Sequence, residues 1–268
     1  MTRGKIILTF DVEEFDIPAE YGRNISFEEQ IQVTTTGLLR IVDLAARHRV
    51  KCTFFTTAVF AQQQPRIIRE ISQQHEIASH GVSHSSFSPT DLRSSKTSLE
   101  SILGRPVNGF RMARFASVDD SVIEQAGYTY NSSLNPTWIP GRYNSFHRPR
   151  LPFKTGKLLN IPLSVTPVLR IPLFWLSLKN MPQWLFHSFM LRTLGHDGFL
   201  SLYVHPWECA DIGSYGLPWY IGRTNGMAML KRVEDLIRNL KDNADFITMS
   251  EFCSSWTDAN SPTPASPP

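Results

Sequence analysis

Strand-like and helix-like segments alternate along the first half of the chain, and this alternation constrains the fold more than any other feature. Short apolar runs rich in β-branched residues predict buried strands, and amphipathic runs between them predict helices. Regular alternation of this kind predicts parallel βα units in a single α/β domain. Strands are expected at 6–10, 50–56, 76–79 and 107–111, and helices at 34–48, 65–74, 89–103 and 118–126.

The second half of the chain is less regular. A proline-rich stretch, 135–172, predicts loops and short strands. In the first half of the chain, Thr36 is the expected cap of the helix at 34–48. Further elements are expected as strands at 158–161, 199–204 and 246–248, a helix at 227–240 and a helical turn at 250–256. We therefore predict one domain over residues 1–256 and a disordered Pro/Ser-rich tail over 257–268.

Composition excludes several classes of protein. Hydrophobic residues make up 41% of the chain, which excludes wholesale disorder, and the net charge of +3 with no dense Lys/Arg run argues against a nucleic-acid binder. Cys52, Cys209 and Cys253 are too far apart for a disulfide framework or a zinc knuckle. Because neither a signal peptide nor an apolar run of about 20 residues is recognisable, the sequence predicts a cytoplasmic protein without a transmembrane segment.

The first candidate site lies where the first predicted strand ends, at Asp11-Val12-Glu13-Glu14. Residues two apart in a strand face the same side, so Asp11 and Glu13 are expected to lie together if the strand continues. Two such carboxylates require a cation, a proton or an arginine between them. A solvated acidic loop explains the same residues and is the more frequent case for a charge run.

The second candidate is the pair His80 and His84. Imidazoles four residues apart meet on one helical turn and can share a metal, and Gly81 would let the backbone turn after the strand. Exposed or hydrogen-bonded histidines are at least as common for an isolated pair. With carboxylates upstream, however, the pair predicts a His-His-carboxylate metal site with open positions. His75 precedes the strand and is expected to be structural.

The third candidate is His205, which follows the predicted strand 199–204 and precedes Pro206. Active sites of α/β barrels lie at the carboxyl ends of the strands. An imidazole there can deliver a proton to a leaving group. A histidine that hydrogen-bonds to a loop carbonyl explains the same residue equally well.

Together these motifs resemble those of the polysaccharide deacetylases, carbohydrate esterase family 4, also called the NodB-homology domain. The order and spacing of the motifs agree over residues 5–256, and their forms look most like a bacterial branch acting on cell-surface or exported polysaccharide precursors. The matching segments are Thr9-Phe10-Asp11, Ser79–His84 as the family's H-[ST]-x-x-H motif in its SHGxSH form, Gly109-Phe110-Arg111 in the place of its R-x-P motif, and Leu202–His205 as its closing L-x-x-H motif.

The resemblance implies a distorted (β/α)7 TIM-like barrel and a divalent metal, zinc first, with Co2+, Ni2+ or Mn2+ as alternatives. It implies a hydrolase that removes an N-acetyl or related acyl group from a sugar, in a polysaccharide or its lipid-linked precursor, by metal-activated water. Position by position, it makes Asp11 the general base, Arg111 the partner of that base and His205 the general acid. His80 and His84 fall on the metal histidines.

The chain departs from the family's first motif. Val12 stands where the family usually has a second Asp. Some branches place the metal carboxylate one residue later, which makes Glu13 the expected ligand. Glu14 is the alternative, because a loop need not keep the period of a strand.

Two further motifs are incomplete. Arg111-Met112-Ala113 lacks the proline of the third motif, so the backbone N–H that binds the oxyanion is expected near Arg114. No fourth motif is found, and the group that tunes His205 is therefore unidentified. Asp197 and Asp211 are only near it in sequence.

Other interpretations stay open. A deformylase or cyclic-amide hydrolase on a small substrate is an alternative within the same fold. A non-catalytic sugar-binding member is another, but mere binding does not require the whole set of Asp11, His80, His84, Arg111 and His205. An aromatic-rich segment within 171–191 is either a lipid-facing lobe, suited to a lipid-linked sugar through peripheral membrane contact, or an irregular part of the core. The core is the more frequent place for such runs. The expected partner is in every case a carbohydrate or other small substrate, not nucleic acid.

Overall fold

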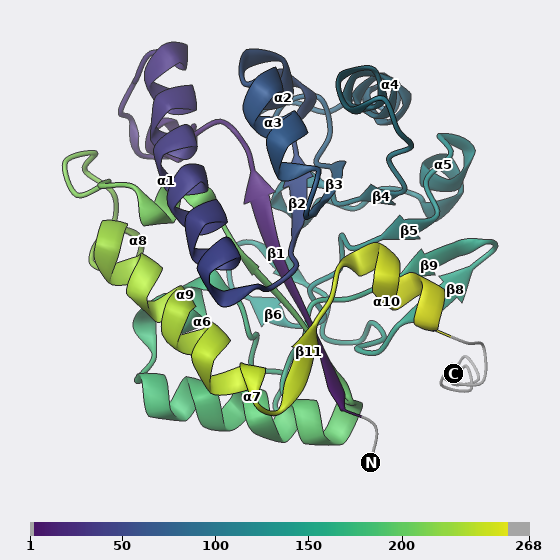
Figure 1. Ribbon diagram of the computed structural model, residues 1–268, viewed down its shortest axis with the longest axis vertical. Coiled ribbons are helices and arrows are strands. Elements are labelled where there is room, and N and C mark those ends of the chain that lie inside the picture. Colours follow the sequence, from purple (N-terminus) through teal and green to yellow (C-terminus); the bar gives the residue numbers. More distant parts are fainter. Residues whose placement is uncertain (1–2, 257–268) are drawn as a thin grey trace.

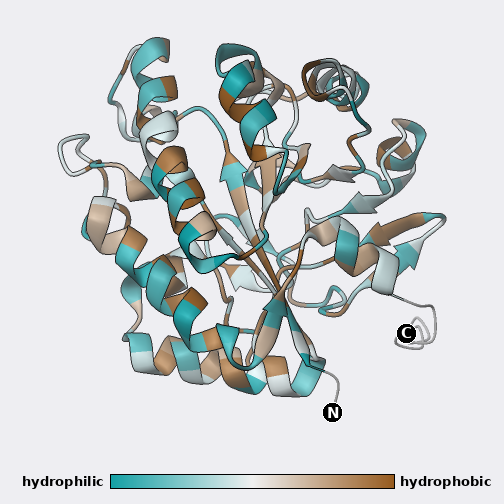
Figure 2. Cartoon of the chain, viewed as in Figure 1, coloured by the Kyte–Doolittle hydropathy of each residue, from teal (hydrophilic) through white to brown (hydrophobic). Residues whose placement is uncertain are grey.

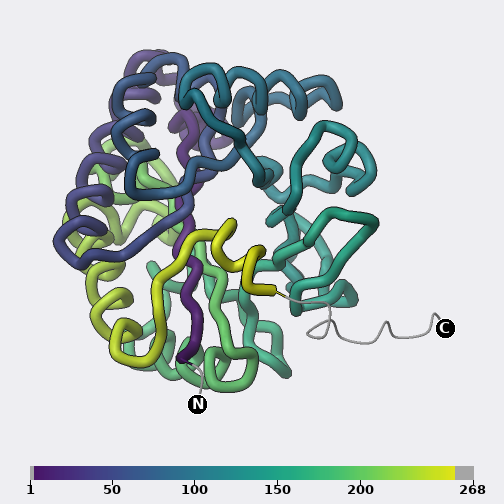
Figure 3. Tube along the Cα trace, turned by 45° about the vertical axis from the view of Figure 1, so that its right-hand side comes forward, coloured from purple at the N-terminus to yellow at the C-terminus, as the bar shows by residue number. Residues whose placement is uncertain are grey.

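A curled, mainly parallel β-sheet forms the centre of the computed structural model, which describes residues 3–256, and helices surround it (Figure 1). The strand order is β10-β1-β2-β3-β4-β5-β9-β8, and β11 also pairs with β1. All neighbouring pairs are parallel except the β8–β9 hairpin. Figure 3 shows β1, in purple, between the green and yellow segments that come from the far end of the chain.

The strands of this sheet are short apart from the first and β10. Their bounds are β1 (Gly4–Val12), β2 (Thr53–Thr56), β3 (Glu76–Ser79), β4 (Gly109–Phe110), β5 (Tyr130–Asn131), β8 (Phe153–Thr155), β9 (Leu158–Asn160), β10 (Phe199–Val204) and β11 (Ala244–Phe246). A separate antiparallel hairpin is made by β6 (Trp138–Ile139) and β7 (Tyr143–Asn144).

Helices connect the parallel strands, as the alternating pattern predicts. They are α1 (Phe27–His48), α2 (Ala58–Gln63), α3 (Pro65–Ile71), α4 (Asp91–Leu103), α5 (Asp120–Gln125), α6 (Trp175–Asn180), α7 (Gln183–Asp197), α8 (Trp219–Gly222), α9 (Gly226–Lys241) and α10 (Met249–Ser255). Three short 3-10 turns complete the description: η1 (Ile17–Tyr21), η2 (Ala113–Phe115) and η3 (Pro206–Cys209).

The two faces of β1 have different surroundings. Ile6, Leu8 and Phe10 pack into the main hydrophobic cluster with the surrounding helices, whereas Ile7 packs with residues inside the curled sheet. Because side chains alternate along a strand, Asp11 shares the inner face with Ile7 and Thr9. The central strands are largely brown in Figure 2, as expected for a parallel sheet buried on both faces.

Most of the predicted elements are present, and two of the predicted strands, 76–79 and 199–204, keep their predicted bounds as β3 and β10. Helix α1 instead begins at Phe27, well before the predicted start at 34. Ser26 caps it by accepting a hydrogen bond from the Glu29 N–H at 3.1 Å. The proposed cap, Thr36, lies inside the helix and donates to the Gln32 carbonyl at 2.9 Å.

The aromatic-rich segment within 171–191 forms helices α6 and α7 rather than an irregular stretch. Phe174, Trp175 and Phe186 are among its buried side chains, which agrees with the core interpretation, although Trp184 is 73% exposed. Among the described residues, no helix combines the length and apolarity needed to cross a bilayer. The predicted tail over 257–268 lies outside the described residues.

Helix α1 packs in direct backbone contact with η3, the segment that follows β10. A Cβ added to Gly37 would lie 1.8 Å from the Pro206 carbonyl oxygen, so the helix backbone packs directly against η3. A glycine in mid-helix is intrinsically unfavourable, and this close approach is the reason for it. The contact fixes the position of the residue before Pro206, which is His205.

We predict that Gly37→Ala destabilises the protein by about 1–3 kcal/mol, because the added methyl overpacks the α1–η3 contact. Gly195→Ala is the matched control, since it also adds a methyl to a helix but meets nothing within 4 Å. The control should be neutral or stabilising by up to about 1 kcal/mol. Urea unfolding measures both changes, and equal stability of the two variants would contradict the assigned contact.

Candidate active site

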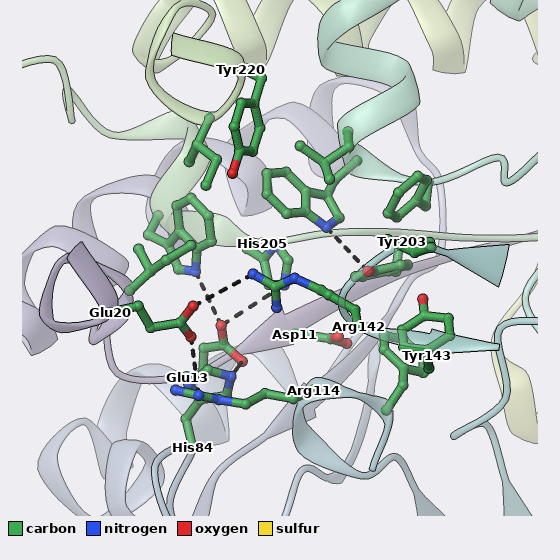
Figure 4. A pocket seen from close by; sticks show the side chains of 18 of the residues that line it. Asp11, Glu13, Glu20, His84, Arg114, Arg142, Tyr143, Tyr203, His205 and Tyr220 are labelled. Carbon is green, nitrogen blue, oxygen red and sulfur yellow. Dashed lines mark hydrogen bonds and ion pairs between the residues drawn. The ribbon is translucent and has the colours of Figure 1, made fainter. Parts of the chain in front are cut away.

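A cavity of about 310 Å3 opens at the carboxyl ends of β1 and β10 and beside the loop after β3 (Figure 4). Asp11, Glu13, His80, His84 and His205 all line it. The structure therefore brings together residues from three distant parts of the chain at one edge of the sheet. Arg111 does not line the cavity but lies fully buried beneath it.

Arg111 holds the carboxylate of Asp11 in place. Its Nη1 lies 2.6 Å from Asp11 Oδ1 and donates to Thr9 Oγ1 at 2.8 Å. Its other nitrogens donate to the carbonyl and the hydroxyl of Ser132, at 3.2 and 3.0 Å, and its guanidinium lies 4.0 Å from the ring centre of Phe55. Each nitrogen of this buried cation thus has a hydrogen-bond partner, and Asp11 cannot rotate without breaking a charge-assisted hydrogen bond.

Glu13 lies between two imidazoles. Its Oε2 is 3.1 Å from His80 Nε2 and 3.3 Å from His84 Nε2, and its Oε1 accepts a hydrogen bond from Trp207 Nε1 at 3.2 Å. Burial alone would raise the pKa of Glu13, but the imidazoles of His84, His205 and His80 lower it by more. The net effect is a pKa well below the ordinary value, which keeps the carboxylate charged.

The far side of each imidazole determines which nitrogen carries a hydrogen. His80 Nδ1 lies 2.9 Å from the carbonyl oxygen of Arg111, and His84 Nδ1 lies 2.7 Å from Asp16 Oδ1. Both partners only accept, so both Nδ1 atoms donate. In the neutral ring this leaves the lone pair of each Nε2 directed at Glu13.

Two lone pairs and a carboxylate oxygen in such close contact require a cation or a proton between them. A proton is one solution. Burial alone would lower the pKa of the His84 imidazole, but Glu13 and Asp16 raise it by more, and the resulting pKa is about 9. A divalent metal is the other, because two neutral Nε2 atoms and a carboxylate are a donor set that zinc prefers. The hydrogen bonds to the Nδ1 atoms would orient these ligands.

The spacing of the three donor atoms also suits a metal. Donors about 2.1 Å from a tetrahedral ion lie about 3.4 Å from one another, close to the separations found here. Among residues 3–256, no group of three or more His, Cys, Asp or Glu side chains forms a ready-made metal cage. Glu13 instead hydrogen-bonds directly to His80 Nε2 and lies close to His84 Nε2, so a metal would replace these contacts.

Glu14, the alternative carboxylate, faces away from the imidazoles. It accepts a hydrogen bond from Thr57 Oγ1 at 3.0 Å and does not line the cavity. Burial gives the Glu14 carboxyl a net raised pKa, whereas the imidazoles give that of Glu13 a net lowered one. The geometry therefore selects Glu13 over Glu14 as the carboxylate beside the two histidines.

The prediction that His80 and His84 share a helical turn is wrong. The segment between them is a loop, in which Gly81 has a φ of +86° and turns the chain after β3. The Gly81 and Val82 carbonyls accept hydrogen bonds from the first two N–H groups of α2. The loop thus accepts the free N–H groups at the amino end of α2. It also stacks the His80 and His84 rings, whose centres lie 6.2 Å apart and whose planes differ by 16°.

His205 is held by residues that the sequence analysis did not identify. Glu208 Oε1 lies 3.1 Å from His205 Nδ1 and accepts the His205 backbone N–H at 3.0 Å, and Glu208 Oε2 pairs with Lys179 Nζ at 3.1 Å. Glu208 and Lys179 are both fully buried. The sequence did contain a local signal for Glu208. This residue lies three positions after His205, which is the spacing of a capping box at the start of a helix.

The two acids that lie near His205 in sequence have other positions. Asp197 pairs with Arg150 at 2.5 Å, and Asp211 is exposed and accepts the Gly213 N–H. Burial lowers the pKa of His205, but Glu13 and Glu208 raise it by more, so the net shift is upward. With Nδ1 occupied by Glu208, Nε2 is the nitrogen that faces the cavity.

Arg114 lies at the mouth of the cavity. Its guanidinium contacts Glu20 at 3.1 Å and Asp16 at 3.4 Å, and Arg142 reaches the same Glu20 at 3.5 Å from the β6–β7 hairpin (Figure 4). Arg114 and Phe115 have φ values of 57° and 55°, which cost of order 1 kcal/mol each for non-glycine residues. The segment that replaces the family's proline therefore keeps a strained turn at the cavity.

His75 lies outside the site, as expected. It is buried at the amino end of β3, where its Nδ1 accepts the Cys52 backbone N–H at 3.3 Å and its ring packs on Phe54. Burial lowers its pKa and favours the neutral ring. This histidine has a structural role.

Residues 1–131 match the family model described as polysaccharide deacetylase. The chain is also 39% identical over 54 residues to the chitooligosaccharide deacetylase of Sinorhizobium fredii (strain NBRC 101917 / NGR234). That alignment covers 20% of this chain and only 25% of the length of the curated relative. The family match contains the acidic cluster, both stacked histidines and Arg111, whereas His205 lies beyond it.

Solved structures of low sequence identity share the fold. A structure described as a "probable Polysaccharide deacetylase" from Pseudomonas aeruginosa PAO1 is 17% identical, with a TM-score of 0.64 and coverage of 94% of this chain and 90% of the other. Puue allantoinase is 15% identical, with a TM-score of 0.62 and coverage of 94% and 89%. The predicted distorted barrel is confirmed. The sequence match over residues 1–131, the shared fold and the order of the motifs make this chain similar to the polysaccharide deacetylases.

Proposed function

We propose that this protein is a metal-dependent hydrolase that removes an N-acetyl or related acyl group from a sugar, in a polysaccharide or its lipid-linked precursor. One observation carries the proposal: a base candidate, a metal-binding donor set and an acid candidate face a single cavity. Asp11 is oriented by a buried arginine, Glu13 lies between two imidazoles, and His205 follows the neighbouring strand β10, with its Nε2 3.8 Å from Glu13 Oε1. Sugar binding alone does not require all of these groups.

An amide resists hydrolysis because its carbonyl is a poor electrophile and its amine a poor leaving group. A divalent metal held by Glu13, His80 and His84 would lower the pKa of water and polarise the acyl oxygen. Asp11 accepts the proton of the attacking water. The guanidinium of Arg111, 2.6 Å away, orients the Asp11 carboxylate through a charge-assisted hydrogen bond and aims it at the cavity.

His205 supplies the proton to the leaving amine. Glu208 accepts from Nδ1, so the proton to be transferred is on Nε2, at the cavity side. The buried charge of Lys179 balances that of Glu208, and Glu13 and Glu208 together raise the pKa of His205. This upward shift favours the imidazolium, which is the form that can donate a proton.

A small cyclic amide is the rival substrate, because the fold is shared with an allantoinase. The cavity favours a sugar, because Tyr143, Tyr203 and Tyr220 line it together with several apolar side chains. Amine release from acetylated chito-oligosaccharides and from a cyclic amide decides between the two. Binding of the sugar without release of amine or acetate would overturn the proposal.

The first prediction concerns the metal. The protein should bind a single divalent ion, zinc in preference to Co2+, Ni2+ or Mn2+, with bonds of about 2.0–2.2 Å to Glu13, His80 and His84. Metal analysis of His80→Ala and of Glu13→Gln should show a large loss. Glu14→Gln is the control and should keep its metal, because Glu14 faces Thr57. If Glu14→Gln lost the metal and Glu13→Gln kept it, Glu14 and not Glu13 would be the carboxylate ligand.

A second prediction concerns Arg111. Arg111→Ala should lower turnover because Asp11 loses its oriented partner, whereas metal content should change little, since the side chain of Arg111 contacts none of the three donors. Arg111→Lys keeps the charge but not the fork of hydrogen bonds, and should restore only part of the activity. Kinetics and metal analysis on the folded variants provide the test. Collapse of metal content in a folded Arg111→Ala protein would assign this arginine a different function.

A third prediction separates the base from the acid. Asp11→Asn and His205→Ala should each lower turnover by about 10²–10⁴-fold and retain the metal. The activity of the parent should fall as pH rises through the pKa of His205, because the imidazolium is the form that donates. His205→Ala should lose this alkaline limb. A His205→Ala enzyme with near-parental activity and an unchanged alkaline limb would refute the assignment of His205 as acid.

A further inference from the structure

The charge of the chain is distributed unevenly. Residues 125–196 contain eight Lys and Arg residues and not a single Asp or Glu, so all 24 acids lie elsewhere. The modest overall charge of +3 therefore conceals one strongly basic segment. This segment includes the β6–β7 hairpin and the loop that precedes α6. Such asymmetry indicates an interaction with an anionic partner.

The same segment exposes large apolar side chains. Trp138 is 62% exposed, Phe146 47%, Val168 82% and Leu169 71%. We refer to these four residues as the loop patch. Single exposed apolar residues are ordinary, but a group of them on one surface marks an interaction site.

Hydrogen bonds hold the residues of the loop patch together. Thr137, next to Trp138, donates its hydroxyl to the Arg170 carbonyl at 2.7 Å, and its own carbonyl accepts the Ser145 N–H at 2.9 Å. The Arg170 guanidinium lies 5.1 Å from the ring centre of Phe146 and donates to the Arg148 carbonyl. The hairpin and the loop around Val168 and Leu169 therefore form one continuous surface.

Basic side chains border the loop patch. His147 and Arg148 are exposed, and no other residue among 3–256 pairs with their side chains. Arg142, whose side chain is 50% exposed, lies on the same hairpin and makes only a 3.5 Å contact with Glu20. Exposed Trp and Leu beside Lys and Arg are the composition of a surface that enters the headgroup region of an anionic bilayer.

The loop patch is also continuous with the candidate active site. Ile139, Pro140, Arg142 and Tyr143 of the β6–β7 hairpin line the cavity, and Trp138 on the same hairpin belongs to the patch. A surface that the patch contacts would therefore lie beside the mouth of the cavity. Figure 4 shows Arg142 and Tyr143 at this mouth.

We propose that the loop patch docks this protein on an anionic lipid surface. Nucleic acid would bind the basic side chains beside the loop patch, but it would not use the four apolar side chains that make up the patch. A second copy of the chain would bring two surfaces of the same charge together in a symmetric contact. Given the proposed function, which this step rests on, docking would present the cavity to a lipid-linked glycan.

The test is sedimentation of the full chain with phosphatidylcholine vesicles, with and without phosphatidylglycerol. The parent should bind the anionic vesicles and lose binding as salt rises, because the electrostatic attraction is screened. Val168→Glu combined with Leu169→Glu should weaken binding by about tenfold or more, since both apolar contacts become repulsive. The matched control, Phe27→Glu with Leu39→Glu, changes two exposed apolar residues of α1 and should bind like the parent.

Several outcomes would overturn the proposal. They are absence of parental binding to either vesicle, equal binding by the patch and control variants, a dimer in lipid-free solution that only the patch variant abolishes, and binding to DNA that the patch variant shares. Thermal unfolding of both variants checks that each is folded. Amine release from a water-soluble sugar needs no vesicle, so failure of the proposed chemistry and failure of docking are separate results.

Discussion

The buried pair of Arg111 and Asp11 is the interaction on which the site depends. Two charges removed from water are stable only when their hydrogen bonds are complete, and here Thr9, Ser132 and the ring of Phe55 complete them. The backbone of Arg111 has a second role, because its carbonyl fixes the tautomer of His80. Arg111, which directly follows β4, therefore orients both the candidate base Asp11 and the candidate metal ligand His80.

The segment that follows β10 uses the same physical principle. Lys179 and Glu208 are fully buried and paired, and Glu208 in turn holds His205 through both its ring and its backbone. A buried ion pair thus orients each of the two catalytic candidates: Asp11 belongs to one pair, and His205 is held by the other. Because buried charges tolerate little movement, the distance between base and acid is set by the barrel itself.

The floor and the rim of the cavity come from different elements. The floor comes from strand ends, where neighbouring backbones fix each side chain, and the rim comes from η2 and the β6–β7 hairpin. Arg114 and Arg142 converge on Glu20 there, and the loop patch continues the rim outward. Chemistry and substrate location are therefore assigned to different elements of one fold.

The sequence by itself determined the βα alternation, the strands β3 and β10, and the motif residues Asp11, His80, His84, Arg111 and His205, because short-range periodicity and local motifs encode them. Tertiary structure alone decided between Glu13 and Glu14, since that choice depends on which carboxylate the distant imidazoles face. It also supplied Lys179 as the partner of Glu208, joined Trp138 to Leu169, and replaced the expected helical turn at His80–His84 with a loop that caps α2. These features arise from contacts between residues far apart along the chain, and no local pattern records them.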